Sequence, residues 1–145
     1  MTEELLDLVK RHEGLRLRPY KCPAGYPTIG YGHRVASMTH PDITEHEADA
    51  ILRADLEEAE RHALVLAPEL AAHPRRLAAL TDLVFNVGAS PLLGSGVVRC
   101  LRSADWPGAA TLFRSWNKAR VAGRLVPLKG LTDRRNTAAH WIVEG

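Results

Sequence analysis

The sequence predicts an α+β fold that is mainly helical, with one small sheet confined to the N-terminal part. Apolar residues recur at helical spacing through most of the chain, whereas glycine and proline punctuate the stretch from Gly14 to Gly32. The chain has 145 residues, 46% of them hydrophobic and 25% charged. These values are typical of one globular domain and exclude disordered, collagenous and fibrous classes.

Residues 2–12 form a short amphipathic pattern, with Thr2 placed to cap a helix. Residues 15–35 carry Tyr20, Tyr26, Ile29 and Tyr31 between turn residues, which favours short strands joined by tight turns. Thr44 and Glu47 spell a capping box, and apolar residues at helical spacing follow until Pro68. We therefore expect one long helix over about residues 44–67.

Pro74 opens a second pattern whose apolar residues nearly surround a helix that ends before Gly88, as in a central core helix. Short helices are predicted over 96–102 and 107–116. A loop containing Gly123 and Pro127 then leads to a last helix over about 131–143. The order of helix, small sheet and several helices is typical of an α+β domain.

The composition limits the cellular compartment and the kinds of site that the sequence predicts. No segment is apolar for long enough to span a membrane, and the acidic start, Met1 to Asp7, lacks the features of a secretory signal. Two cysteines, Cys22 and Cys100, are too few for a disulfide scaffold and are expected to be free thiols, Cys100 as plain core. The histidines form no metal-ligand pattern, so neither a metal nor a cofactor is expected.

Charge is distributed unevenly along the chain. Residues 1–71 hold 8 Lys+Arg and 13 Asp+Glu, a net charge of −5, whereas residues 72–145 hold 11 and 4, a net charge of +7. A basic half favours contact with a polyanion, which could be nucleic acid, a bacterial envelope or acidic lipid. The alternative is an ordinary solubilising surface, and the sequence shows no nucleic-acid-binding motif.

Glu13 stands directly after the first predicted helix. A carboxylate there opposes the helix dipole, so the protonated form is favoured, as a general acid requires. The alternative is an exposed, solvated glutamate. Eight residues separate Glu13 from Cys22, and five more separate Cys22 from Thr28.

The segment Glu13-Gly14 to Thr28-Ile29-Gly30-Tyr31-Gly32-His33 resembles the catalytic segment of phage-type lysozymes, the endolysins of glycoside hydrolase family 24. Downstream, Phe85-Asn86-Val87-Gly88 and Gly130-Leu131-Thr132-Asp133-Arg134-Arg135 are similar to two further elements of that family. The second element commonly continues to an acidic residue, which is replaced here by Ala138. The resemblance covers nearly the whole chain.

The resemblance implies a lysozyme-like single catalytic domain over residues 1–145. A small sheet lobe would comprise residues 13–43, and a helical lobe would comprise residues 68–145 together with 2–12. The helix over 44–67 would connect the two lobes, and a cleft would lie between them. It further implies an inverting muramidase that hydrolyses the β-1,4 bond between N-acetylmuramic acid and N-acetylglucosamine in peptidoglycan.

In this interpretation Glu13 is the general acid, while Cys22 and Thr28 handle the attacking water. Cys22 departs from the Asp that is commoner in the family, so it acts as a base or as a nucleophile once ionised. Tyr26, Gly32, Phe85 and Asn86 are expected to face the cleft and bind sugar, with a core role competing for Phe85. Arg134 and Arg135 open the last helix, one expected to pair with Glu13 and the other with the anionic polymer. His33 is expected to be structural, with an acidic partner further on.

Three other interpretations stay open. The first is a cell-wall peptidase or amidase with Cys22 as nucleophile and His33 or His40 as base. The second is a binding module without activity, and the third is a lytic transglycosylase. The family resemblance implies a monomer held in the host bacterial cytoplasm and released through holin lesions to reach the periplasm and wall, with peptidoglycan strands as partner and no nucleic acid.

Overall fold

The structure, a computed structural model, describes residues 1–145 and confirms a mainly helical α+β fold. The helices are α1 (Glu3–Glu13), α2 (Glu45–Leu66), α3 (Pro74–Val87), α4 (Gly96–Arg102), α5 (Trp106–Ser115) and α6 (Lys129–Glu144), with short 3-10 turns η1 (Pro68–Ala72) and η2 (Ser90–Leu92). The strands are β1 (Arg16–Lys21), β2 (Pro27–Gly30), β3 (His33–Arg34), β4 (Lys118–Val121) and β5 (Arg124–Pro127).

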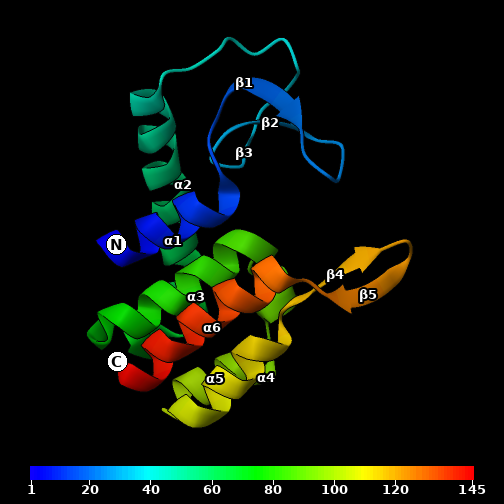
Figure 1. Cartoon of the computed structure of the whole chain (residues 1–145). Coiled ribbons are helices and arrows are strands. Elements are labelled where there is room, and N and C mark those ends of the chain that lie inside the picture. The colour runs from blue at the N-terminus through cyan, green and yellow to red at the C-terminus, as the bar shows by residue number, and fades with distance from the viewer.

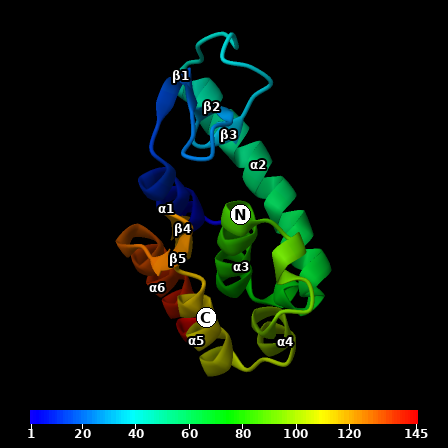
Figure 2. The same cartoon turned by 90° about the vertical axis from the view of Figure 1, so that its right-hand side faces the viewer.

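Strands β1, β2 and β3 form an antiparallel sheet at one end of the molecule, and the helices gather at the other end (Figure 1). Helix α2 runs from the sheet down to the helices, as the view in Figure 2 shows. Helix α1 precedes β1 and packs among the helices, so its C-terminal end points toward the sheet. The last residue of α1 therefore lies where the two parts of the molecule meet.

Helix α2 begins at the predicted capping box. The Thr44 hydroxyl accepts from the Glu47 N–H at 3.1 Å, and the Glu47 carboxylate accepts from the Thr44 N–H at 3.2 Å. One stripe of the helix is buried, made of Ala48, Leu52, Leu56, Ala59, Ala63 and Leu66, while its other faces are charged. None of the helices combines the length and the apolar composition that crossing a membrane requires.

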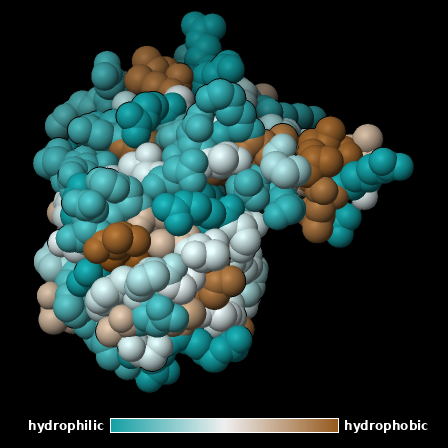
Figure 3. Space-filling model, turned by 60° about the horizontal axis from the view of Figure 1, so that its bottom comes forward, coloured by the Kyte–Doolittle hydropathy of each residue, from teal (hydrophilic) through white to brown (hydrophobic).

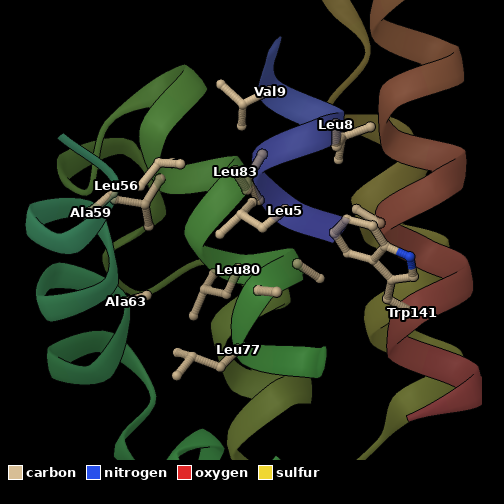
Figure 4. Close-up of a cluster of buried hydrophobic side chains, with 14 of the residues drawn as sticks. Leu5, Leu8, Val9, Leu56, Ala59, Ala63, Leu77, Leu80, Leu83 and Trp141 are labelled. Carbon is tan, nitrogen blue, oxygen red and sulfur yellow. The ribbon is translucent and has the colours of Figure 1, made fainter. Parts of the chain in front are cut away.

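The core is formed where α3 is surrounded by α1, α2 and α6. Figure 4 shows side chains from all four helices meeting there, including Leu5 and Leu8 of α1, Leu56 of α2, Leu80 and Leu83 of α3 and Trp141 of α6. Every residue of α3 from Leu77 to Val84 is buried, which confirms the predicted central helix. This burial includes one charged side chain, Asp82, that the apolar pattern leaves unexplained.

The prediction of a single N-terminal sheet is wrong, because residues 118–127 form a second, two-stranded sheet. Strands β4 and β5 pair antiparallel in continuous register from Lys118–Pro127 to Val121–Arg124. Ala122 (φ 50°) and Gly123 (φ 81°) make the two-residue turn between them. Positive φ at both positions is the geometry of a tight hairpin turn, which Asn-Gly signals more clearly than Ala-Gly does.

Candidate active site

A cleft of about 660 Å³ is bordered by the end of α1, the β1–β3 sheet and the end of α3. All three predicted catalytic residues, Glu13, Cys22 and Thr28, line it. The complete lining is His12, Glu13, Tyr20, Cys22, Pro23, Ala24, Thr28, Gly32, Arg34, Phe85 and Asn86. The cleft therefore brings residues of the sheet into one space with residues of the helices.

Helix α1 ends one residue later than predicted, so Glu13 is its last residue and not the first residue after it. The Glu13 carboxyl oxygen Oε1 accepts a hydrogen bond from Nη1 of Arg134 at 2.9 Å. Arg134 lies in α6 and is 121 residues away in the chain, so the bond joins the two ends of the sequence. This pairing confirms the expectation for one of the two arginines, and it fixes the direction of the Glu13 carboxyl group.

Arg134 is itself held by Asp82 of α3. Its Nε and Nη2 donate to the Asp82 carboxylate at 2.8 to 3.1 Å, and both side chains are buried. Burial would lower the pKa of Arg134, but attraction to Asp82 and then to Glu13 outweighs it and raises that pKa. Because Asp82 makes most of these bonds, Arg134 stays a fixed cation that positions Glu13.

Arg135 does not face the solvent or the polymer, so that expectation is wrong. The side chain is fully buried, and its Nε donates to the carbonyl of Trp116 at 2.9 Å. Its Nη2 donates to Oδ1 of Asn86, while Nη1 has no hydrogen-bond partner and lies 3.6 Å from Asp82. Burial lowers the pKa of Arg135 to about 10. The bond to Oδ1 leaves the N–H₂ group of Asn86, a residue that lines the cleft, as a free donor.

Gly32 lies against the other oxygen of Glu13. A Cβ atom at this position would come within 2.8 Å of the Glu13 Oε2, and Gly32 has a φ of +80°. Both facts require glycine, the first for space and the second for backbone conformation. The loop between β2 and β3 can therefore approach Glu13 closely.

Cys22 and Thr28 flank the turn between β1 and β2. The Cys22 N–H donates to the Tyr26 carbonyl at 3.0 Å, and the buried Thr28 hydroxyl donates to the same carbonyl at 2.8 Å. The Tyr26 and Ala24 backbone N–H groups, in that order, hold the pKa of the partly exposed Cys22 thiol below its usual value. The Thr28 side chain and the charge of Arg34 lower that pKa further, so the turn and its neighbours favour the thiolate.

His33 has the acidic partner expected for it. Its Nδ1 lies 2.8 Å from Oδ2 of Asp55 in α2, and this pair ties the sheet to the long helix. His33 does not line the cleft, and Nδ1 of His40 contacts the Pro41 carbonyl. Both histidines are therefore occupied away from the cleft.

Residues 10–138 match the family described as phage lysozyme. The chain belongs to this family. It is a lysozyme, an enzyme of cell-wall lysis that acts on peptidoglycan.

Relatives agree in sequence and in structure. The chain is 38% identical to an endolysin of Acyrthosiphon pisum secondary endosymbiont phage 1 over 136 residues, which cover 93% of this chain and 92% of that protein. The muramidase domain of SpmX from Asticaccaulis excentricus matches with a TM-score of 0.84 and 27% identity, over 98% and 96% of the two chains. An endolysin from Escherichia coli O157:H7 phage FAHEc1 matches with a TM-score of 0.82 and 27% identity, over 99% of this chain and 92% of that one.

The four predicted sugar-binding residues of this lysozyme lie in different surroundings. Gly32, Phe85 and Asn86 line the cleft, and Phe85 also packs against the core, so both interpretations of that residue apply. Tyr26 does not line the cleft. Its ring is 48% exposed and lies under the guanidinium of Arg34, 3.9 Å from the ring centre.

The sequence analysis missed three residues of the candidate site. Asp82 was detectable as a lone acid within an apolar helix, because a buried charge needs a partner. His12 lines the cleft, and burial, followed by the charges of Arg134 and Arg11, lowers its pKa. Arg34 follows the recognisable His33, but no pattern in the sequence places its side chain at the cleft.

Proposed function

We propose that this lysozyme hydrolyses the β-1,4 bond between N-acetylmuramic acid and N-acetylglucosamine, with Glu13 as general acid and Cys22 and Thr28 handling the attacking water. One observation carries the proposal: Glu13 and the pair Cys22 and Thr28 come from different elements and line the same cleft. Hydrolysis of a glycosidic bond needs a proton donor for the leaving oxygen and a second group that acts on the other face of the sugar.

Glu13 suits the first role because only one of its oxygens is engaged. Oε1 accepts from Arg134, whereas Oε2 lies beside Gly32 at the cleft and is left to carry the transferred proton. The carboxyl group cannot turn freely, since Arg134 is itself fixed by Asp82. A fixed acid spares the reaction part of the entropic cost of aligning the donor with the leaving oxygen.

Cys22 and Thr28 suit the second role. The lowered pKa of the Cys22 thiol favours a thiolate, which is a base able to take a proton from water. Thr28 donates its own hydroxyl hydrogen to the Tyr26 carbonyl, so the lone pairs of its oxygen remain to accept from that water. Attack by water on the face opposite the leaving group would invert the configuration of the sugar.

The residues that line the cleft also argue against the alternative of a cysteine peptidase. A cysteine nucleophile in such an enzyme is activated by a histidine within hydrogen-bond reach. The two candidates do not line the cleft, since His33 pairs with Asp55 and His40 contacts the Pro41 carbonyl. His12 lines the cleft but makes no hydrogen bond to Cys22. The glycosidase is therefore the better supported of the two functions.

The proposal extends to the cellular setting. We propose a monomer that is stored in the host bacterial cytoplasm, is released through holin lesions and reaches the wall with its basic half toward the anionic envelope. The family resemblance and the endolysin relatives support this setting. The net charge of +7 on residues 72–145 supports the envelope contact.

Replacement of Glu13 by Gln tests the proposed reaction. An amide cannot donate the acid proton but is nearly isosteric, so release of reducing ends from purified wall should fall by about 10² to 10⁴. The exposed Glu3 provides a matched control, because E3Q makes the same chemical change away from the cleft. The melting temperatures of both variants report whether the fold persists.

Product analysis separates the remaining alternatives. New reducing ends without an anhydro ring support hydrolysis, whereas anhydro sugars would indicate a transglycosylase and new free amines a peptidase or amidase. A folded E13Q variant that lyses wall as fast as the wild type would remove Glu13 from the mechanism.

A further inference from the structure

We propose that Arg34 binds a carboxylate of the peptidoglycan substrate at the sheet side of the cleft, and that Tyr26 holds the guanidinium in place for it. This inference rests on the proposed function and adds to it a group that distinguishes anionic from neutral glycan strands. The carboxylate is either that of the lactyl group on muramic acid or one carried by the stem peptide.

The first support is the place of Arg34 beside the reaction centre. Arg34 lies in β3 directly opposite Thr28 of β2, and both residues line the cleft. Residues that are opposite in an antiparallel pair project from the same face of a sheet. A glycan strand that fills the cleft and reaches Thr28 therefore passes the side chain of Arg34.

The second support is that Arg34 has no acidic partner. Arg134 is paired with Glu13 and Asp82, and Arg18 of the same sheet is paired with Asp42 at 3.1 Å. The side chain of Arg34, in contrast, contacts an aromatic ring and no carboxylate. Among the residues that line the cleft, it is a cation with no carboxylate partner, although its charge contributes to the lowered pKa of the Cys22 thiol. Such a guanidinium matches a carboxylate, which accepts two parallel N–H groups.

The third support is the preformed position of the group. The Arg34 guanidinium carbon lies 3.9 Å from the centre of the Tyr26 ring. Stacking leaves the N–H groups at the edge of the guanidinium free to donate, and it reduces the side-chain entropy lost on binding. This arrangement gives Tyr26, which does not line the cleft, a positioning role in substrate recognition.

Binding measurements in the E13Q background test the proposal, because this variant should not hydrolyse the ligands during the titration. Three soluble ligands are compared by calorimetry: glycan strands with stem peptides, strands stripped of peptides so that the lactyl carboxylate is free, and a neutral chito-oligosaccharide. R34Q should raise the Kd for carboxylate-bearing strands about 10- to 100-fold, as expected for a lost charge-assisted bond. The Kd for the neutral chito-oligosaccharide should not change.

Companion variants separate recognition from general charge and from folding. R18Q removes an equal charge from the same sheet outside the cleft and should leave all three Kd values unchanged. Y26L should weaken binding of the same carboxylate-bearing strands about two- to fivefold, as expected for an exposed cation–π contact, and Y26F should restore it. R34K should recover only part of the loss, because an ammonium lacks the planar pair of donors.

The pattern across ligands identifies the source of the carboxylate. A loss confined to peptide-bearing strands assigns it to the stem peptide, and a loss confined to stripped strands assigns it to the lactyl group. Equal losses on the chito-oligosaccharide, or no loss on any ligand, would overturn the proposal. Cleavage of strands by E13Q during titration would instead refute the proposed role of Glu13, so the two failures are distinct.

Discussion

Gly32 allows the sheet to approach the Glu13 carboxyl group. In G32A the new methyl would meet Oε2 of Glu13, and a positive φ in an L-residue costs about 1 to 2 kcal/mol. If Glu13 is the general acid as proposed, wall hydrolysis should fall by at least about tenfold, since small displacements of such a group can cost more than that.

Gly94 provides the matched control for Gly32. It has a φ of +67° but open space around its Cβ position, so G94A carries the backbone strain without touching the site. Both variants should lose thermal stability, measured as melting temperature, but only G32A should lose activity. Equal activity losses would show that the contact with Glu13 is unimportant.

Cys22 gives a pH-dependent prediction. As a base it must be ionised, so activity should rise with pH through the lowered pKa of the thiol. An aspartate ionises near pH 4, so C22D should keep substantial activity and move the acid limb of the pH profile to lower pH. C22A should lose most activity. An inactive, folded C22D variant would favour the thiol as nucleophile, because a carboxylate does not replace a thiolate in that role.

The residues that meet in the candidate site were partly predictable, for a physical reason. Glu13, Cys22 and Thr28 lie within one short segment, so their spacing could be compared with a known pattern. Tyr26 belongs to the same segment, yet its ring stacks on Arg34 and not on the cleft wall. Spacing along a strand predicts which residues are near one another, whereas the direction of an exposed side chain depends on its neighbours in space.

At the scale of elements, the Asp82 side chain joins α3 to α6. Replacing it by Asn would leave Arg134 and Arg135 buried without a full counter-charge, which typically costs about 3 to 5 kcal/mol. The free energy of unfolding of D82N, measured with denaturant, should fall by about that amount. D133N is the control, because Asp133 forms only an exposed pair with Lys129, worth about 0 to 1 kcal/mol. A D82N variant as stable as D133N would contradict this account of the network.

Elements with strong local signals were predicted well, and those without them were missed. Residues close together in the sequence determine the helix caps at Thr2 and Thr44, and the same holds for the apolar face of α3. The hairpin β4–β5 has no buried face of its own, since most of its residues are exposed. Its strands therefore lack the alternation of apolar and polar residues that identifies a strand at the sequence level.

At the scale of the whole molecule, the chain order explains why the site lies between the two parts. Helix α1 supplies Glu13 and then passes directly into the sheet, while α6 returns from the far end of the chain to fix it. The resemblance implied two lobes joined by the helix over 44–67, and the structure has that helix as α2. It could not reveal the hairpin, which projects from the helices and carries apolar side chains among polar ones (Figure 3).

The same projection concentrates the basic charge of the C-terminal half. No acidic residue occurs between Asp105 and Asp133, a stretch that includes Arg120 and Arg124 in the exposed hairpin. Elsewhere in this half, Arg102 of α4 pairs with Glu69 at 3.2 Å, so its charge is partly compensated. The hairpin arginines are therefore the better pair for a test of envelope contact.

Neutralising both hairpin arginines should weaken binding to isolated anionic envelope material at low salt. The wild type should itself bind less as ionic strength rises, because the Debye length shrinks from about 10 Å at 0.1 M to about 3 Å at 1 M. R120Q/R124Q should bind less and also show a shallower salt dependence, measured by sedimentation with envelope at increasing salt. R11Q/R61Q removes two exposed charges that form no ion pair from the acidic half and should bind like the wild type. If the hairpin variant keeps both the binding and the salt dependence of the wild type, the basic hairpin has no part in targeting, and the uneven charge is only a feature of solubility.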